Sequence, residues 1–506
     1  MSLTSLVRPI FTPRMRELER HISEGETLQR ETLQRLLALG RQTAWGAEHG
    51  LAGVKDYGQF AASMPLATYE EHKALIDRMR RGERDLLCPG GVRWYAKSSG
   101  TTNDTSKFLP VSARGLKDTH YRGGTDVVVM YLRDHPESRI FDGRALILGG
   151  SHAPNYNLKG SLVGDLSAIL IENINPLVNL LRVPKKTTAL ISDFEVKRDK
   201  IAREAMGRNV SNISGVPSWM LSVLSRMMEL SGKEHLEDVW PNIEVFFHGG
   251  VAFTPYREQY RRLITSPRMS YMETYNASEG FFGIQSDPGD ASMLLMLDYG
   301  VFYEFIAMDT FDETDIASNT AVPLWEVRTG VNYAMVITTT SGLWRYVIGD
   351  TVRFTSTNPY KFVITGRTKS FINAFGEELI VDNAERGLQA ACMATGAEVA
   401  EYTAAPVFMD DKGKCRHQWL VEFRVMPDDL SRFASVLDDT LRQLNSDYDA
   451  KRFHDITLQP LQMLVARQGL FDEWMKSRGK LGGQNKVPRL SNNRQHIEAL
   501  IALNER

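Results

Sequence analysis

Short apolar runs that end in glycine-rich or polar loops recur along this chain. Four of them begin at Arg144, Ile243, Met269 and Tyr333. Continuous apolar runs of this length are typical of strands that are buried on both faces of a sheet. After the second run, Thr254-Pro255 supplies an N-cap and a first helical residue, which predicts the order strand, loop, helix. The pattern therefore predicts an α/β fold.

Length and charge limit the classes to which the chain can belong. Its 506 residues are about three times the usual length of a domain, so we expect two or more domains. Sixty lysines and arginines stand against 62 aspartates and glutamates, which gives a formal net charge of −2 without a long run of one sign. Neither a nucleic-acid-binding surface nor a polybasic membrane anchor is expected, and the predicted partner is a small molecule.

Cysteine usage and hydropathy predict a cytoplasmic protein. Cys88, Cys392 and Cys415 are far apart and form no CxxC pair, which argues against a disulfide framework or a zinc site. The N-terminus shows no export signal, and residues 14–40 alternate charged and apolar residues at helical spacing. No apolar run approaches the roughly 18 residues that a membrane span needs. We therefore expect a cytoplasmic location and no membrane contact.

A second module begins near residue 370, where the sequence pattern changes. Residues 364–378 are rich in small and polar residues, which suits a hinge. We therefore divide the chain into an N-terminal domain, 1–367, and a smaller α+β C-terminal domain, 368–506. The pattern within the second domain predicts a helix at 382–396, strands at 398–409 and 417–426, a helix at 428–445 and a strand at 455–465.

Residues 97–107 read Lys-Ser-Ser-Gly-Thr-Thr-Asn-Asp-Thr-Ser-Lys and have the composition of a phosphate-binding loop. Hydroxyl and backbone N–H groups donate hydrogen bonds to phosphoryl oxygens, Gly100 permits close approach of the backbone, and Lys107 adds a positive charge. A Walker A loop is disfavoured, because Thr105 stands where its second glycine belongs and Lys107 lies one residue late. A solvated Ser/Thr turn is the alternative.

The segment Tyr275-Asn-Ala-Ser-Glu279-Gly280 follows a predicted strand. Its aromatic ring can stack on a nucleobase, while the Glu279 carboxylate can hold Mg²⁺ at the phosphates, since Mg²⁺ prefers one or two carboxylates together with phosphate oxygens. The alternative is a turn at the end of a strand that carries a surface glutamate.

Two further segments have nucleotide-binding chemistry. Gly349-Asp350 ends an apolar stretch, and one carboxylate can accept hydrogen bonds from both hydroxyls of a ribose. A plain Gly-Asp turn is the alternative there. Residues 478–489 form a glycine-rich loop with Lys480 and Lys486, which either closes over a nucleotide or is a solvated basic loop.

Taken in order, the segments SSGTTNDTSK, YNASEG, GLWRYVIGD, GRTKSFINAFGEEL and NKVPR resemble the GH3 family of acyl-acid amido synthetases, a branch of the acyl-adenylate-forming enzymes. The resemblance covers nearly the whole chain, including VWPN at 239–242 and FYEFI at 302–306. It implies a large adenylation domain with β-sheets flanked by helices, a small C-terminal domain that rotates as a mobile lid, and ATP with Mg²⁺ as cofactors. The implied activity joins a carboxylic acid to an amine, usually an amino acid, through acyl-AMP, with release of AMP and pyrophosphate. We expect a monomer whose partners are these small molecules.

The resemblance also implies roles for individual residues. The ATP phosphates would be surrounded by Ser98, Ser99, Thr101 and Thr102. Adenine, the α-phosphate and Mg²⁺ would lie near Tyr275, Ser278 and Glu279 respectively, and Asn276, Ala277 and Gly280 would complete that nucleotide-binding segment. The ribose would be bound by Asp350, helped by Arg367. Glu279 and Lys486 are the expected catalytic residues, and Lys486 would neutralise charge on the reacting oxygens.

The sequence departs from the family pattern at two positions. Asp104 stands where the plant members have glycine, and a carboxylate next to phosphate is unfavourable unless it points away or helps to hold the metal. Gly376 stands where the plant enzymes have a lysine, so a nucleotide contact cannot be transferred to it.

Candidates for the acyl-acid pocket follow the first loop and the second strand. His120, Tyr121 and Arg122 lie where plant relatives place acyl contacts, and His248 ends a predicted strand. Positions on a helix face and a satisfied histidine at a strand end are the structural alternatives. The stripe from Trp219 to Met228 is expected to be helix core.

Two other enzyme classes compete with this interpretation. Gly149-Gly-Ser151-His-Ala approaches the nucleophile elbow of a serine hydrolase, and His248-Gly-Gly is similar to a lipase oxyanion loop. The order is wrong for that fold, since the oxyanion loop should precede the nucleophile. An acyl-CoA ligase would share the adenylation half-reaction and differ in accepting a thiol. The SSGTT and NKVPR forms favour the amide-forming branch.

Overall fold

The chain divides into two compact units. The computed structural model describes residues 2–98, 107–250, 253, 256–313, 315–368, 371–372, 379–407, 416–445, 448–449, 452, 458–478, 487–491 and 494–505. Of these, the first unit holds the residues up to Ile348 together with Val352–Val363, and the second holds Gly349–Thr351 and the residues from Ile364 onward. The chain thus passes between the units within β15 (Tyr360–Arg367).

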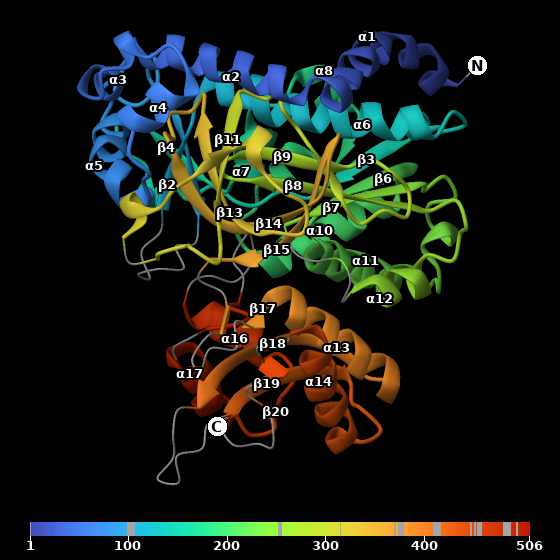
Figure 1. Cartoon of the computed structure of the whole chain (residues 1–506). Coiled ribbons are helices and arrows are strands. Elements are labelled where there is room, and N and C mark those ends of the chain that lie inside the picture. Colours follow the sequence, from blue (N-terminus) through green and yellow to red (C-terminus); the bar gives the residue numbers. More distant parts are fainter. Residues whose placement is uncertain are drawn as a thin grey trace. The chain divides into compact units, whose positions relative to one another are not determined.

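A twelve-stranded mixed sheet organises the first unit (Figure 1). Its strands, in spatial order, are β12 (Val322–Pro323), β11 (Val301–Ala307), β13 (Asn332–Thr339), β14 (Tyr346–Thr357), β15, β10 (Met293–Leu295), β9 (Gly280–Gln285), β8 (Ser270–Ala277), β7 (Val245–Gly249), β6 (Val210–Gly215), β3 (Arg144–Ile147) and β5 (Arg182–Val183). Strands β3, β5, β6, β7 and β8 pair in parallel, and β8 pairs with β9 in an antiparallel hairpin. The four strands predicted from apolar runs are β3, β7, β8 and β13.

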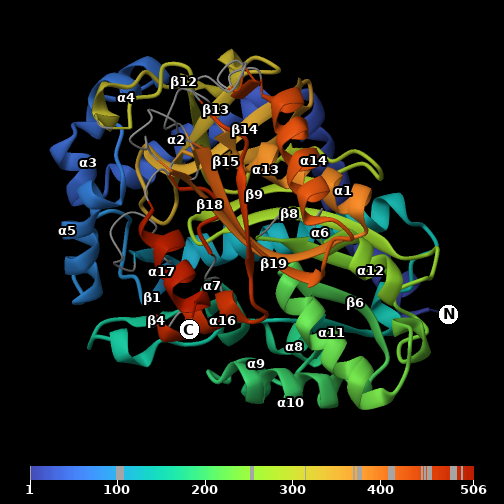
Figure 2. The same ribbon diagram turned by 90° about the horizontal axis from the view of Figure 1, so that it is seen from below.

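Helices cover both faces of the parallel strands (Figures 1 and 2). Those of the first unit are α1 (Leu3–Ser23), α2 (Gly25–Gly40), α3 (Ala44–Glu48), α4 (Tyr57–Ser63), α5 (Tyr69–Arg80), α6 (Arg122–Asp134), α7 (Leu166–Glu172), α8 (Pro176–Leu180), α9 (Lys186–Ala189), α10 (Phe194–Met206), α11 (Pro217–Ser231) and α12 (Arg257–Leu263). A π-helical turn, Gly115–Tyr121, leads into α6. The predicted helix start at Thr254-Pro255 lies outside the described residues.

Alternation along the strands divides the core between the two faces. In β7, Phe247 packs with α1 and α6, whereas Phe246 packs with α10, α11 and α12. The same split occurs in β8, where Met272 belongs to the first cluster and Tyr271 borders the second. Successive side chains of a strand point to opposite faces, so burial on both faces explains the uninterrupted apolar runs. The stripe from Trp219 to Met228 lies on α11 and contributes to the second cluster, as predicted.

The second unit is an α+β module built on a three-stranded sheet. Strand β19 (Arg416–Val425) lies between β18 (Glu398–Val407) and β20 (Gln462–Ala466). Trp419 and Val421 face α13 (Val381–Thr395) and α14 (Leu430–Leu444), while Leu420 faces α16 (Leu470–Ser477) and α17 (Gln495–Asn504). A short pair, β16 (Phe371–Ile372) and β17 (Leu379–Ile380), precedes α13. The predicted α/β class with a smaller α+β module is confirmed.

The boundaries predicted in this unit agree with the observed ones to within a few residues, except at the last strand. That strand was expected over 455–465, and β20 instead comprises Gln462–Ala466. Residues 453–457 lie outside the described part of the chain. No helix among the described residues is long and apolar enough to span a membrane.

A buried ion pair ties the start of β14 to β11. The Arg345 guanidinium donates to Glu304 at 2.7 Å and to the carbonyls of Ala61 and Met64 at 2.9 and 2.7 Å. The side chains of Arg345 and Glu304 are 7% and 1% exposed. Tyr57 adds a hydrogen bond from its hydroxyl to Glu304 at 3.0 Å. The carboxylate therefore has a full set of partners, which a buried charge requires.

Replacing Arg345 with methionine should destabilise the first unit by about 3–5 kcal/mol, because it leaves Glu304 buried without its counter-charge. Urea denaturation of the variant and the wild type measures the difference. Arg203→Met is the matched control: its pair with Asp199 is partly exposed, and we expect a loss of no more than about 1 kcal/mol. Equal, small losses in both variants would contradict the structural role of the buried pair.

Candidate functional site

The predicted phosphate loop joins the two strands of a hairpin. β1 (Trp94–Ser98) pairs with β2 (Lys107–Val111) in antiparallel register, with Ser98 opposite Lys107. A small sheet with the order β2-β1-β4 (Leu162–Gly164) holds the hairpin. Ser99, Thr101, Thr102 and Asp104 lie outside the described residues, as does the side chain of Ser98. The register places the lysines at the two ends of the predicted loop on opposite faces of the hairpin: Lys97 contacts the Tyr156 ring at 4.4 Å, and Lys107 lies 5.9 Å from the Tyr69 ring.

The second predicted segment forms the β8–β9 hairpin rather than a loop after a strand. Tyr275, Asn276 and Ala277 end β8, Ser278 and Glu279 make the turn, and Gly280 begins β9. Continuation of the strand pairing explains the difference, because Ala277 pairs with Gly280. Ser278 is buried at 5% exposure, whereas Glu279 is half-buried. A hydroxyl and a carboxylate are therefore adjacent at the tip of this hairpin.

Tyr275 is part of the hydrophobic core. The side chain is 7% exposed, and its ring meets Phe282 edge-on at 4.9 Å and Phe362 at 6.1 Å. These neighbours fix the plane of the ring. Contact between Tyr275 and a nucleobase remains a prediction.

His120 comes together with Asn276. Nδ1 of His120 lies 3.3 Å from the Asn276 side-chain oxygen, although the two residues are 156 positions apart. Burial lowers the pKa of His120 to about 4, so its ring is neutral at physiological pH. A residue expected in the acyl pocket thus contacts one expected at the nucleotide.

Tyr121 and Arg122 have structural partners instead. The Tyr121 hydroxyl donates to the Leu170 carbonyl at 2.9 Å. Arg122 pairs with Asp298 at 2.7 Å, and Asp298 also binds Arg14. These two side chains anchor the start of α6 to neighbouring elements, and their contact with an acyl acid remains a prediction.

His248 ends β7 and is 3% exposed. Its ring stacks on Phe253 at 4.2 Å, and burial lowers its pKa to about 3. Directly opposite on β8 is Glu273, which the sequence did not single out. Burial raises the pKa of Glu273 to about 7. A charged residue within the apolar run at 269–275 is the signal that could have found it.

The second unit brings together Asp350 and Arg367. Nε of Arg367 lies 3.0 Å from the Asp350 carboxylate, which is mostly buried. Their hairpin is closed by a bond from the Thr368 N–H to the Gly349 carbonyl at 2.9 Å. Gly349 adopts φ +88°, a backbone conformation that favours glycine. The GD and GR segments, 17 residues apart, therefore form one local unit.

The basic loop ends in a stem that is bound to β18. Lys480 and Lys486 lie outside the described residues, but Val487 to Ser491 are described. The Arg489 carbonyl accepts from Ala404 at 2.8 Å, and the Pro488 carbonyl accepts from Thr403 at 2.7 Å. The Arg489 side chain pairs with Glu401 at 3.1 Å and Glu385 at 3.5 Å.

The geometry at Ser151 disfavours a serine hydrolase. The hydroxyl donates to the Ile191 carbonyl at 3.2 Å, and the backbone N–H donates to Asp165 at 2.8 Å. No histidine in the described part of the chain accepts a hydrogen bond from Ser151. Its neighbour His152 instead stacks on Trp94 at 5.5 Å.

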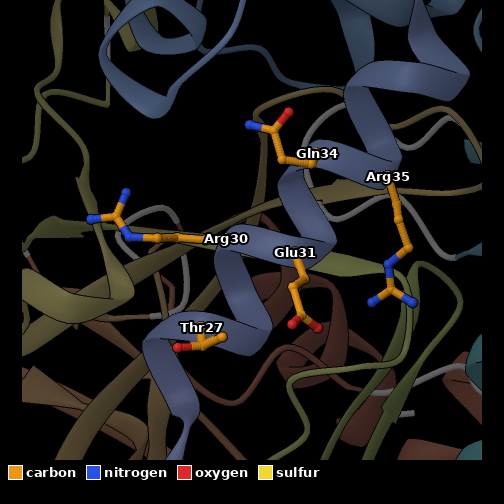
Figure 3. A pocket seen from close by; sticks show the side chains of 5 residues that line it. All are labelled: Thr27, Arg30, Glu31, Gln34 and Arg35. Carbon is orange, nitrogen blue, oxygen red and sulfur yellow. The ribbon is translucent and has the colours of Figure 1, made fainter.

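A surface hollow of about 570 Å³ lies along α2 (Figure 3). Its lining consists of one helix face: Thr27, Arg30, Glu31, Gln34 and Arg35. Figure 3 shows these side chains spreading outward from the helix, without a common point toward which they converge. We assign no site there. Among the described residues, no group of three or more His, Cys, Asp or Glu side chains is arranged to hold a metal ion.

His120 should make folding stability depend on pH. Its pKa of about 4 lies below the ordinary value of 6.5, so between these pH values the unfolded chain binds the proton and stability falls as pH decreases. We expect the wild type to lose about 3 kcal/mol more than His120→Gln between pH 6.5 and 4. Urea denaturation across this pH range measures the free energy of unfolding. The control is His152→Gln, at a half-buried histidine, whose pH dependence should match that of the wild type. Superimposable curves for wild type and His120→Gln would contradict this.

Comparison with known proteins covers most of the chain. The GH3 family N-terminal domain matches residues 14–269, the central domain 294–367 and the C-terminal domain 382–495. An indole-3-acetic acid-amido synthetase from Arabidopsis thaliana is 23% identical, covering 92% of this chain and 89% of its own. A 4-substituted benzoates-glutamate ligase from the same plant is also 23% identical, with 96% of both chains covered.

Solved structures show the same fold. A GH3 acyl acid amido synthetase superposes with a TM-score of 0.78 at 19% identity, covering 98% of this chain and 95% of the other. A 2-hydroxyisobutyryl-CoA ligase gives 0.59 at 11% identity, covering 96% and 94%. Because the three GH3 domains match in order along most of its length, the chain belongs to the GH3 family of acyl-acid amido synthetases, ligases of the acyl-adenylate-forming class.

Proposed function

We propose that this protein uses ATP to adenylate a carboxylic acid and then transfers the acyl group from acyl-AMP to an amine, an amino acid in particular. The observation that carries the proposal is the match of all three GH3 domains to one continuous chain. Its relatives include an indole-3-acetic acid-amido synthetase, a 4-substituted benzoates-glutamate ligase and a jasmonoyl-L-amino acid synthetase. At 23% identity the particular acid and amine do not transfer to this chain.

The chemistry poses an electrostatic problem. The substrate carboxylate must attack the α-phosphorus while the bond to pyrophosphate breaks, and two like charges at 4 Å repel by about 4 kcal/mol at an effective dielectric near 20. In the second step the amine nitrogen attacks the acyl carbon, the bond to AMP breaks and the nitrogen loses a proton. Cationic groups and oriented donors stabilise the charge that develops in both steps.

The hairpin tip at Ser278 and Glu279 fits this need. We assign the Ser278 hydroxyl to an α-phosphate oxygen and the Glu279 carboxylate to Mg²⁺, which would supply positive charge at the phosphates when bound. One carboxylate next to one hydroxyl is a donor set that suits a metal otherwise held by phosphate oxygens. We also assign Tyr275 to adenine, with Asn276, Ala277 and Gly280 completing the nucleotide-binding segment.

We propose further nucleotide contacts for residues of the hairpin loop and, separately, of the second unit. We assign Ser98, Ser99, Thr101 and Thr102 to the β- and γ-phosphates. Asp350 would accept from the ribose hydroxyls, with Arg367 orienting its carboxylate. Lys486 would neutralise the reacting oxygens. A boundary at 367/368, with 368–506 moving as a lid, remains our proposal for how water is kept from the reactive anhydride.

Purified protein supplied with Mg-ATP and a suitable acid should form AMP and pyrophosphate, because adenylation breaks the bond between the α- and β-phosphates. Acid-dependent ATP–pyrophosphate exchange across an acid panel, followed by mass spectrometry of products with each amino acid, measures both halves. Formation of ADP, or no exchange with any acid, would contradict adenylation. An acyl-CoA product in parallel reactions with CoA, in place of amides, would identify a thioester-forming ligase.

The two assignments in the C-terminal region differ in which kinetic constant they control. Asp350→Ala should raise the KM for ATP by about tenfold or more, since a lost charge-assisted hydrogen bond costs about 1.5–3 kcal/mol. Lys486→Ala should lower kcat by about 100-fold and change the KM for ATP by no more than about threefold, because its charge acts mainly in the transition state. Asp439→Ala and Lys476→Ala are matched controls in the same region. Unchanged constants in both test variants would refute the assignments.

A further inference from the structure

Three neighbouring parallel strands carry a row of one glycine and two polar residues, which lies at the carboxyl ends of β6 and β7 and in the middle of β8. Gly215 of β6 is the register partner of His248 on β7, and His248 is the partner of Glu273 on β8. Residues paired across parallel strands point to the same face, here the face covered by α11 and α12. Ligands of open α/β sheets bind at this carboxyl edge.

His248 carries an unsatisfied nitrogen. Its side chain is 3% exposed between Phe246 and Phe253, and the buried Nδ1 has no hydrogen-bond partner among the residues that the structure describes. Leaving such a group unsatisfied costs about 1–3 kcal/mol, so most buried polar atoms of native proteins are paired. With a pKa of about 3 the ring is neutral, which gives it one donor and one acceptor nitrogen. A bound polar group would complete this site.

Glu273 presents its carboxyl group on the same face. Its backbone N–H donates to Gln285 at 3.0 Å, but no described residue donates to its carboxyl oxygens. Arg257 is the charged neighbour of both Glu273 and His248. With a pKa of about 7, the carboxyl group is present near neutral pH in both its donor and its acceptor form.

The end of β6 brings further hydrogen-bond donors toward His248. Gly215 is the register partner of His248, and α11 begins two residues later without a side-chain cap at Val216. Gly250, at φ +82°, lies against this helix start: a Cβ placed on it would be 3.3 Å from a methyl group of Val216. Uncapped N–H groups of a helix are donors that seek an acceptor.

The ligand group must therefore both donate and accept a hydrogen bond. It must also be small and uncharged, because the surrounding side chains are apolar. A hydroxyl group meets these conditions: it can donate to Glu273 or to the acceptor nitrogen of His248, and accept from the start of α11. An ammonium group cannot accept, and Arg257 disfavours it. A carboxylate cannot donate, and Glu273 in its charged form opposes it.

We propose that His248, Glu273 and the uncapped start of α11 form a subsite for a hydroxyl group, which makes a hydroxylated carboxylic acid the acyl substrate of this protein. The inference rests on the proposed function for the identity of the ligand as an acyl acid. Glu273 lies two residues before Tyr275 on β8, and residues two apart on a strand share a face, so the subsite borders the segment proposed to bind the nucleotide. Phe246 and Phe253 supply apolar contacts for the rest of the acid.

The subsite should discriminate strongly between acids that carry the hydroxyl group and acids that lack it. An acid without the hydroxyl group would bury the same apolar surface but leave Nδ1 of His248 and the Glu273 carboxyl group without partners. Sites built to bind a substrate hydroxyl reject the analogue that lacks it, because their own polar groups are then unpaired.

Paired acids that differ by one hydroxyl group test the inference: 4-hydroxybenzoate with benzoate, 4-hydroxyphenylacetate with phenylacetate, and 12-hydroxydodecanoate with dodecanoate. For the full-length protein, isothermal titration gives the Kd of each acid, and ATP–pyrophosphate exchange gives kcat/KM. We expect the hydroxylated member of at least one pair to be preferred by about tenfold or more in both assays.

Two shape-conserving variants assign the preference to the subsite. His248→Phe keeps the ring stacking and Glu273→Gln keeps the side-chain length, so each variant should reduce the preference for the hydroxylated acid to below about threefold. His49→Phe is the control, since His49 also stacks on an aromatic ring, that of Trp45 at 4.1 Å. It should retain the full preference.

The two assays separate this inference from the proposed function. Binding with the hydroxyl preference but without pyrophosphate exchange would refute adenylation and support the subsite. Exchange with equal use of both members of every pair, or a preference that neither variant reduces, would overturn the subsite and leave adenylation standing. Failure of every acid to bind would overturn it as well.

Discussion

Burial of apolar side chains on both faces of the parallel strands fixes their register, and the positions of the functional groups follow from that register. Phe246 and Phe247 are committed to opposite faces of the sheet by the helices that cover them. A shift of one residue in the register of β7 would turn the His248 side chain toward α6 and would place Phe246 in the cluster that now contains Phe247. The same alternation in β8 sends Glu273 to the face of His248 and Asn276 to the face of His120. The hydrophobic core thus decides which polar groups meet.

Residues in the family-typical segments divide into structural and chemical ones. Arg345 of GLWRY and Glu304 of FYEFI form a buried ion pair that joins strands and helix α4, so their presence is explained by the cost of leaving either charge unpaired. Glu279 and Asp350 differ, because each retains partly exposed carboxylate oxygens on a hairpin. Physical context, not membership in a motif, separates a scaffold residue from a candidate for chemistry.

Local pattern predicted the elements of the fold well, and pairings over long distances poorly. Apolar runs identified β3, β7, β8 and β13, and a change in sequence pattern identified the α+β module. This works because burial on one or two faces of an element determines the order of apolar and polar residues along it. The contact of His120 with Asn276, and the attachment of Arg122 to Asp298, depend on which distant segments pack together. Glu273 was missed for a related reason: a single acid in a strand resembles an exposed position until the helix that covers it is known.

The stem of the basic loop in the second unit contains a cluster of charged side chains whose desolvation opposes folding. Two carboxylates, the buried Glu385 and the partly buried Glu401, share the guanidinium of Arg489, and desolvation raises the pKa of both acids. Apolar residues of similar volume would be as stabilising or more so, therefore stability alone does not explain the cluster. A directional ion pair does what apolar packing cannot, since it fixes one register between the stem and β18. Lys486 lies three residues before Arg489 in the chain, so the position at which its loop leaves the sheet is set by this pair.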